Sequence, residues 1–312
     1  MYTNKNCLIV LVFSLLLFNS SCSTLQDQNS IKQKIKVDLQ TTNEKKEMII
    51  EYLLNQDIEF SIDFSNESSY SLSNNFLETR MKYFCNSYID DQKKNLESTI
   101  FKVKNREKKV LIVYSKEFAN SVANYIRLYP NEIFLLIDEQ NYKLQIDEIF
   151  DVQSSNERFS RIKNLDASLD LIHAPRVRQD IGKVYFITNY QIGKRIVPIV
   201  RNYSIKIDFY STTEIFHDVA NMRELIDFEG MTVPISQNII NQISKNNFKN
   251  MRYELEKIML VDFFEIEKIL QNNLSKKNVE LSSGVFDISR NTCILRDLPL
   301  TKLTSDFFIN QT

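Results

Sequence analysis

The residues best suited to chemistry are few in this chain of 312 residues. Nucleophilic catalysis needs a serine or cysteine beside a base, most often a histidine held by a carboxylate. His173 and His217 are the only histidines, neither lies in a recognisable motif, and the sequence G-x-S-x-G does not occur. With 40 acidic residues some carboxylates will pair, so a hydrolase stays open as a third, weaker hypothesis. We expect a protein that is not an enzyme.

Phosphate, metal and nucleic-acid chemistry are equally poorly supported. A backbone cradle for phosphate needs several glycines close together, but the four glycines are scattered, at Gly182, Gly193, Gly230 and Gly284. The cysteines form no C-x-x-C pair, so no metal site and no cofactor are expected. The 39 basic and 40 acidic residues leave a net charge of −1, without the basic excess of nucleic-acid binders.

The first 22 residues have the layout of a secretory leader. Lys5 precedes the apolar run "CLIVLVFSLLLF" at 7–18, which is too short to span a bilayer, and small residues follow it. The ending "NSSC" resembles the lipobox of bacterial lipoproteins, with Asn19 where an aliphatic residue is usual. We therefore expect lipid on Cys22; simple cleavage and a buried core helix are the alternatives. Ser23 resembles the sorting residue of lipoproteins anchored in the bacterial outer membrane and facing the periplasm.

Two cysteines remain beyond the leader, Cys85 and Cys293. An oxidising periplasm permits a bridge between them, and two buried thiols are the alternative. The sequence leaves both open.

Short apolar strands alternate with helical stretches from about residue 106. The pattern predicts a doubly wound parallel α/β sheet. The expected strands are 108–114, 131–138, 183–188, 205–211 and 231–236, and the expected helices are 115–129, 154–172 and 190–202.

Polar residues follow three of these strands. Ligands of such sheets bind beyond the carboxyl ends of the strands, so these positions are the candidates for a small-molecule site. Ordinary loop residues are the simpler interpretation. The candidates are Tyr114, Ser115, Thr188, Asn189, Tyr190, Ser211 and Thr212.

The stretch "APRVRQDIGKVYFIT" at 174–188 places three charges just before a buried strand. We expect Arg176, Arg178 and Asp180 to pair where the chain enters the sheet, which would fix the start of the strand more than it stabilises the protein. Binding of an anionic partner is the alternative.

The two ends of the mature chain differ from its centre. Residues 23–44 are polar and predict a tether. Residues 251–274 predict a long amphipathic helix, and 283–303 predict a hairpin that turns at "SRN". Residues 57–65 suggest a strand and 88–104 a helix.

Five dispersed stretches between 106 and 303 resemble the penicillin-binding-protein activator lipoproteins, also called LpoA or LppC. The matching residues are Arg176, Arg178, Asp180 and Ile181; Ile207 to Thr212; Phe228, Glu229, Gly230, Met231 and Pro234; Asp262; and Gly284, Phe286, Ile294, Arg296 and Leu298. Gly182 replaces a family acid, and the tryptophan after Pro234 and an Ala-Leu-Gly stretch before Asp262 are missing.

This resemblance implies a type I periplasmic-binding fold with a reduced first lobe at 45–108, a second α/β lobe at 109–236, and C-terminal helices and a hairpin at 237–312. It also implies a non-enzymatic lipoprotein that binds and stimulates a peptidoglycan-synthesising penicillin-binding protein. The family's N-terminal helical-repeat domain has no counterpart here. A solute-binding lipoprotein with its ligand in the inter-lobe crevice is the alternative.

Overall fold

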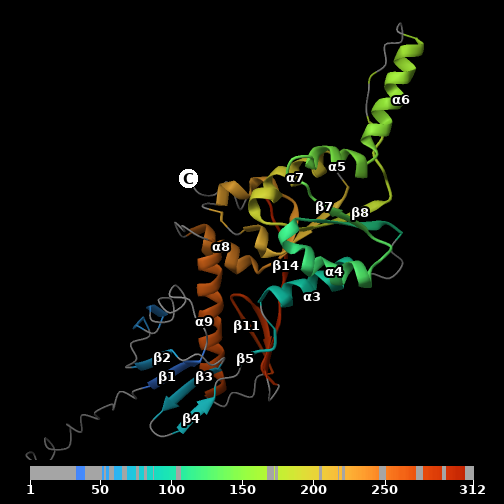
Figure 1. Cartoon of the computed structure of the whole chain (residues 1–312). Coiled ribbons are helices and arrows are strands. Elements are labelled where there is room, and N and C mark those ends of the chain that lie inside the picture. Colours follow the sequence, from blue (N-terminus) through green and yellow to red (C-terminus); the bar gives the residue numbers. More distant parts are fainter. Residues whose placement is uncertain are drawn as a thin grey trace, which may run out of the picture. The chain divides into compact units, whose positions relative to one another are not determined.

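The chain divides into two compact units, Met1–Tyr83 and Phe84–Thr312. The computed structural model (Figure 1) describes residues 33–38, 51–52, 54–55, 60–64, 69–74, 77–80, 83–86, 88–102, 107–166, 172, 175–203, 206–216, 218–219, 222–245, 251–271, 277–289 and 293–305.

The first unit contains a four-stranded sheet in the order β2-β1-β3-β4. Strands β1 (Gln33–Asp38) and β2 (Phe60–Phe64) are parallel, whereas β3 (Ser69–Asn74) and β4 (Leu77–Arg80) are added antiparallel. β2 lies within the stretch 57–65 that the sequence suggests is a strand. β1 lies inside 23–44, so part of the segment expected to be a tether is paired in this sheet.

A six-stranded sheet in the order β14-β10-β9-β8-β6-β7 forms the centre of the second unit. Five of its strands run parallel, and β14 (Leu300–Lys302) is antiparallel to β10. The parallel strands are β6 (Lys109–Tyr114), β7 (Ile133–Leu136), β8 (Ile181–Ile187), β9 (Asp208–Ser211) and β10 (Met231–Pro234). The predicted doubly wound α/β sheet is confirmed.

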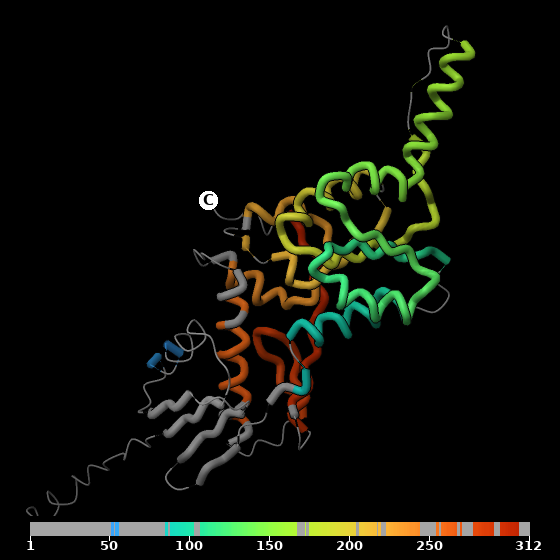
Figure 2. Tube along the Cα trace, in the orientation of Figure 1, coloured from blue at the N-terminus to red at the C-terminus, as the bar shows by residue number. Residues whose placement is uncertain are grey.

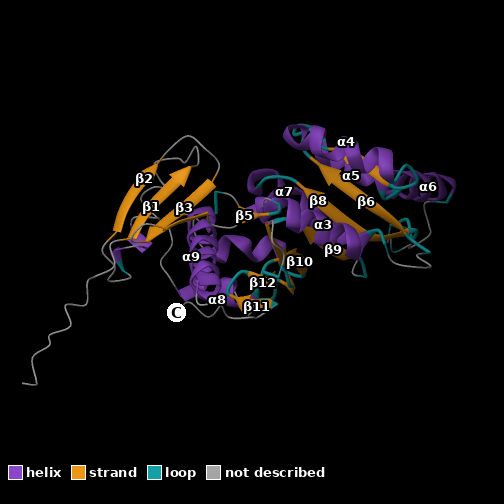
Figure 3. Cartoon of the chain, turned by 90° about the horizontal axis from the view of Figure 1, so that it is seen from below, coloured by secondary structure: helices purple, strands orange, loops and turns teal. Residues whose placement is uncertain are grey.

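Helices cover both faces of this sheet (Figure 3), and successive apolar side chains of a strand point to opposite faces. In β6, Leu111 and Val113 face a core that includes α5 (Tyr142–Ile149) and α7 (Tyr190–Tyr203). Val110 and Ile112 face a second core with α3 (Tyr88–Ile100) and α4 (Ala119–Leu128). The 3-10 helix η1 (Lys116–Phe118) precedes α4, whereas η2 (Thr213–Phe216) and η3 (Met222–Phe228) lie between β9 and β10.

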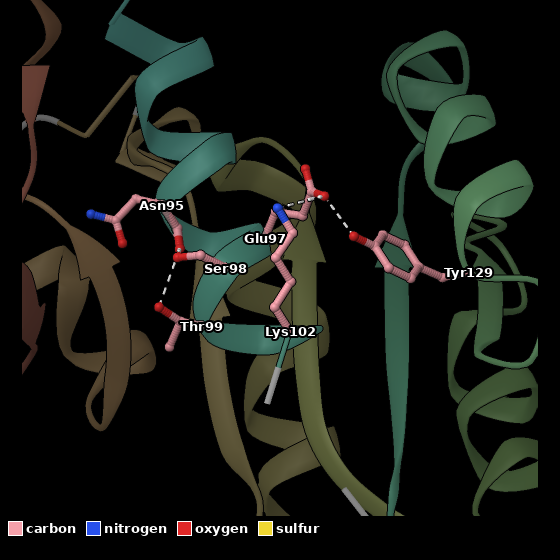
Figure 4. Close-up of polar contacts among 6 residues, drawn as sticks. All are labelled: Asn95, Glu97, Ser98, Thr99, Lys102 and Tyr129. Carbon is pink, nitrogen blue, oxygen red and sulfur yellow. Dashed lines mark hydrogen bonds and ion pairs between the residues drawn. The ribbon is translucent and has the colours of Figure 1, made fainter. Parts of the chain in front are cut away.

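Helix α3 contacts the end of α4 through both apolar and polar side chains at its own carboxyl end. Phe101 stacks on Tyr129 with ring centroids 4.1 Å apart. The Tyr129 hydroxyl donates to a carboxylate oxygen of Glu97 at 2.5 Å, and Lys102 pairs with the same oxygen at 3.7 Å (Figure 4). Residues 88–104 were expected to be a helix, and this helix packs on the parallel sheet.

The chain beyond β10 forms α8 (Gln237–Lys245), the long helix α9 (Met251–Gln271) and a second sheet of this unit (Figure 2). That sheet has the order β11-β12-β13-β5, with β11 (Asn278–Leu281), β12 (Gly284–Asp287), β13 (Cys293–Asp297) and β5 (Tyr83–Phe84). The C-terminal helix and the β12–β13 hairpin confirm the prediction for this region. The sequence analysis did not anticipate β11, β14 or α5.

Cys85 is disulfide-bonded, so the alternative of a free buried thiol is wrong for this residue. Its backbone amide donates to the carbonyl of Ile294 at 2.9 Å, next to Cys293 in β13. The side chain of Cys293 lies outside the described residues.

Two glycines permit approaches that a side chain would block. A Cβ at Gly193 would lie 3.0 Å from both Ile215 and Phe228, so its absence allows α7 to approach η2 and η3 closely. A Cβ at Gly284, where φ is +156°, would lie 2.5 Å from the carbonyl oxygen of Asp297. This glycine therefore sets how closely β12 and β13 can approach.

Candidate functional site

The candidate ligand residues lie together at the carboxyl edge of the six-stranded sheet. The chain leaves β6 toward β7 on one side and later returns to β8 on the other, so the order of strands reverses between β6 and β8. In parallel α/β sheets such a switch point opens a crevice where ligands bind. The residues following β6, β8 and β9 adjoin because these strands are neighbours. Whether they bind a ligand stays a prediction.

Glu117 connects two of the predicted groups. Its Oε1 accepts hydrogen bonds from the Ser115 hydroxyl at 3.1 Å and from the Asn189 side-chain amide at 2.7 Å. The other end of the Asn189 amide accepts from the backbone N–H of Ile192 at 3.0 Å, which caps α7. Ser115 and Asn189 are therefore occupied by contacts within the protein.

The other predicted hydroxyl-bearing residues Ser211, Thr212 and Thr188 at this edge of the sheet are buried. Ser211 donates to the carbonyl of Phe186 at 2.9 Å, and Thr212 donates to Glu214 Oε2 at 3.1 Å. Thr188 is buried, and its Oγ1 has no hydrogen-bond partner within the part of the chain that the structure describes. A buried hydroxyl without a partner is costly, so Thr188 is a predicted residue whose hydroxyl a ligand could still bind.

Gln92 of α3 occupies the end of β9. Its side chain is fully buried; Oε1 accepts from the backbone N–H of Thr213 at 2.8 Å and Nε2 donates to the Thr213 hydroxyl at 2.8 Å. The amide thus satisfies both a donor and an acceptor that a polar ligand could otherwise bind. A solute at this position would have to displace α3.

The two predicted tyrosines have different surroundings. Tyr114 is partly buried and packs against the core on the α3 and α4 face. Tyr190 is buried against Phe228, and the Lys194 ammonium lies 4.9 Å from its ring centroid. Burial raises the pKa of the Tyr190 hydroxyl to about 12, with the charge of Glu224 acting in the same direction. Both side chains contribute to packing.

The charges that precede β8 lie at the opposite end of the strand from this crevice. Arg178 donates from Nε and Nη2 to the two carboxylate oxygens of Asp180 at 2.5 and 2.9 Å. Hydrogen bonding to Arg178 lowers the pKa of Asp180, and the same contact raises the pKa of Arg178. The predicted pairing is confirmed for these two residues. Arg176 has an exposed side chain, and its backbone amide donates to Ser155 Oγ at 2.9 Å.

A buried charged junction connects α3 to β13. Arg296 Nε donates to Asp91 Oδ2 at 3.1 Å, with the two side chains only 2% and 5% exposed. Asn86 donates to the other Asp91 oxygen at 2.9 Å, and the guanidinium lies 4.8 Å from the ring centroid of Tyr88. Burial lowers the pKa of Arg296, and the charge of Asp91 opposes that shift.

Asp262 of α9 extends this junction to the second sheet. Its two oxygens accept from the backbone amides of Ser282 and Ser283 at 3.2 and 2.5 Å, at the turn between β11 and β12. Burial raises its pKa, and these hydrogen bonds lower it in part. We name the set Tyr88, Asp91, Asp262 and Arg296 the buried junction.

Sequence reasoning selected Asp262 and Arg296 through the family resemblance, but it missed Gln92, Asp91 and Glu117. A signal existed for one of them. Gln92 lies four residues before Leu96 and eight before Ile100, so it continues the apolar face of the predicted helix. A polar side chain on such a face predicts a buried hydrogen bond.

Several predicted features cannot be placed. Cys22, His173 and His217 lie outside the described residues. Among the residues that are described, no group of three or more His, Cys, Asp or Glu side chains could hold a metal ion. The described helices include none that is long and apolar enough to cross a membrane.

No known protein family and no curated protein matches this sequence. Similar solved structures include LpoA of Haemophilus influenzae, with 8% identity and a TM-score of 0.43 over 69% of this chain and 38% of that one. Its C-domain, described as a regulator of PBP1A, has 8% identity and a TM-score of 0.38 over 84% of this chain and 92% of that one.

An extracellular ligand-binding receptor from Verminephrobacter eiseniae is similar at 8% identity, with a TM-score of 0.35 over 70% of this chain and 63% of that one. The present chain thus spans between 38% and 52% of the longer LpoA structures that it matches. TM-scores below 0.5 carry no argument about function.

Proposed function

We propose that this chain is a non-enzymatic lipoprotein that binds a peptidoglycan-synthesising penicillin-binding protein and raises its activity. The observation that carries the proposal is the position of residues that resemble the activator lipoproteins. Asp262 and Arg296 belong to the buried junction, and Gly284 sets the spacing of the hairpin beside it. Part of the resemblance therefore falls on residues of one connected region of the fold.

The position of the protein in the cell is part of the same proposal. Lipid on Cys22 would anchor it in the outer membrane, facing the periplasm where such synthases work. Acyl chains contribute about 0.8 kcal/mol per buried methylene, so a multiply acylated cysteine holds firmly. Globomycin, which blocks lipoprotein signal cleavage, should make the larger precursor accumulate, and Cys22→Ser should abolish labelling with a palmitate analogue. Unchanged labelling of the Cys22→Ser variant would contradict lipidation at this residue.

Solute binding is the second candidate, and Thr188 is the observation that favours it. Its buried hydroxyl has no partner among the described residues and lies at the switch point of the sheet. Against it, Ser115, Asn189 and Ser211 already make internal hydrogen bonds, and Gln92 fills the end of β9. Most polar groups at this edge of the sheet are therefore already bonded within the protein, and regulation of a synthase is the better supported function.

The decisive experiment uses the mature chain, residues 23–312, and purified bifunctional penicillin-binding proteins of the same organism. Binding is measured by biolayer interferometry, and glycan polymerisation and cross-linking are measured with lipid II as substrate. We expect saturable binding to one synthase and a several-fold faster cross-linking rate. A heat-denatured sample is the control. If a folded protein binds no synthase and changes neither rate, the proposal fails and a thermal-shift screen of small solutes becomes the next test.

A further inference from the structure

In helix α6 (Val152–Leu165) the fully buried side chains lie in the first turns. Its first turns are anchored, because Val152 and Ser155 are buried and Ser155 Oγ accepts from the Arg176 amide. Beyond them the helix extends away from the rest of the second unit (Figure 1). Ile162 is 47% exposed and Leu165 is 87% exposed, so the outer half presents apolar side chains to solvent.

The exposed apolar residues continue the buried face of the helix. At about 100° per residue, Val152, Ser155, Phe159, Ile162 and Leu165 fall on one side. Phe159 is partly buried, and Arg158, which pairs with Asp151 at 3.3 Å, lies on the same side nearer the anchored end. Ile172, on the segment that returns toward β8, is 97% exposed. We name Phe159, Ile162 and Leu165 the α6 stripe.

Positive charge borders the α6 stripe on both sides. By the same geometry Lys163 lies about 40° from Phe159 on one side, and Arg161 lies about 40° from Leu165 on the other. Both are exposed, and no ion pair to either occurs within the described part of the chain. The helix therefore offers an apolar centre between two cations.

This arrangement favours one kind of occupant. A helix of this length is marginally stable alone in water, so burial of its outer face would stabilise it. A second copy of the chain is disfavoured because α6 paired with itself would bring Arg161 and Lys163 of the two copies together. A bilayer surface is disfavoured because the stripe is narrow, with one apolar side chain per turn, and the opposite face carries Glu157. An apolar groove with acidic rims on a protein fits both features.

We propose that the outer half of α6 is the element that docks into an acidic-rimmed apolar groove on the synthase. This proposal rests on the proposed function, because it names the contact through which that function would work. The α6 stripe supplies the buried anchors, and Arg161 and Lys163 pair with carboxylates at the rims of the groove.

The test compares four versions of the mature chain in binding to the purified synthase. Ile162→Asp with Leu165→Asp removes the anchors, and Arg161→Glu with Lys163→Glu reverses the flanking charges. The matched control is Leu144→Asp with Lys143→Glu on α5, where both residues are also exposed. Thermal unfolding of each version confirms that it is folded, which is expected because every changed side chain is exposed.

We expect the anchor variant to lose affinity by about tenfold or more, as substitutions at the centre of interfaces do. The charge variant should bind more weakly mainly at low salt, because screening reduces the contribution of the wild-type charges at high salt. The α5 control should bind as the wild type does.

Each other outcome overturns the inference in a recognisable way. If the wild type binds the synthase and the anchor variant binds equally well, α6 is not the docking element although the proposed function stands. If the wild type does not bind at all, the proposed function fails and the docking proposal fails with it. If the anchor variant still binds the synthase but no longer floats with phosphatidylglycerol–phosphatidylethanolamine vesicles as the wild type does, α6 contacts the membrane instead.

Discussion

The buried junction makes a strong prediction about stability. Asp91→Asn keeps the shape of the side chain but removes the charge that faces Arg296, and both side chains are at least 95% buried. Removing one partner of a buried ion pair costs about 3–5 kcal/mol, because the remaining charge is left uncompensated in a medium that solvates it poorly. For a unit of this size each kcal/mol lowers the melting temperature by about 2–4 °C. The expected fall is therefore roughly 6–20 °C.

The assay is urea unfolding of the mature chain followed by circular dichroism, with a scan of melting temperature beside it. Asp180→Asn is the matched control, since the Arg178–Asp180 pair is bidentate but 32% and 46% exposed and should contribute about 0–1 kcal/mol. Replacing the buried pair by Asp91→Leu with Arg296→Met should restore much of the loss, because the uncompensated guanidinium of Arg296 is then no longer present. The reasoning is refuted if Asp91→Asn and Asp180→Asn cost the same.

Three further predictions concern residues near this junction. Gly284→Ala should destabilise the second unit by about 2–4 kcal/mol in urea unfolding, because the new Cβ would lie 2.5 Å from a carbonyl oxygen of β13. A loss of stability under about 0.5 kcal/mol would contradict this steric argument. Gln92→Ala should lower the stability by about 2 kcal/mol in the same assay, because it leaves the backbone N–H and the hydroxyl of Thr213 buried without a partner. If the variant is as stable as the wild type, water has replaced the side-chain amide of Gln92. The pKa of Asp262 is raised in the folded protein above its ordinary value of 3.8. Between these two pKa values the folded protein binds more protons than the unfolded chain does. The contribution of Asp262 to the free energy of unfolding therefore falls as the pH rises through this range. Asp262→Asn should remove this fall from the melting temperature measured against pH, and two parallel curves would count against it.

The central sheet could be predicted because each of its parallel strands has a recognisable local sequence pattern. Runs such as "KKVLIVY" are apolar on both faces, which is what a parallel strand covered by helices requires, and β6 begins within one residue of the prediction. The edge strand β14 was missed because it has three residues and exposed side chains. Its position depends on pairing with β10, about 70 residues earlier in the chain, which no local pattern records.

The site was harder to predict than the fold for a related reason. The polar residues that follow the strands were found from their positions, but what satisfies them comes from a distant segment. Gln92 and Thr213 are 121 residues apart, and Asp91 and Arg296 are 205 apart. A charged or amide side chain in a helix usually points to solvent, so composition alone gave no reason to expect Asp91 and Gln92 to be buried.

The antiparallel strand β14 has a consequence for how the protein acquires its structure. Until Leu300–Lys302 has joined the sheet, the backbone groups along one edge of β10 are exposed and can pair with another chain. The contacts that close the second unit, from Asn95 to Leu298 and from Asp91 to Arg296, also span more than 200 residues. Closure over such separations is slow, so a chain delivered amino end first passes through a long interval with this edge open. Chaperones that shield strand edges would act during that interval, and changes that delay the pairing of β14 should appear first as aggregation during folding.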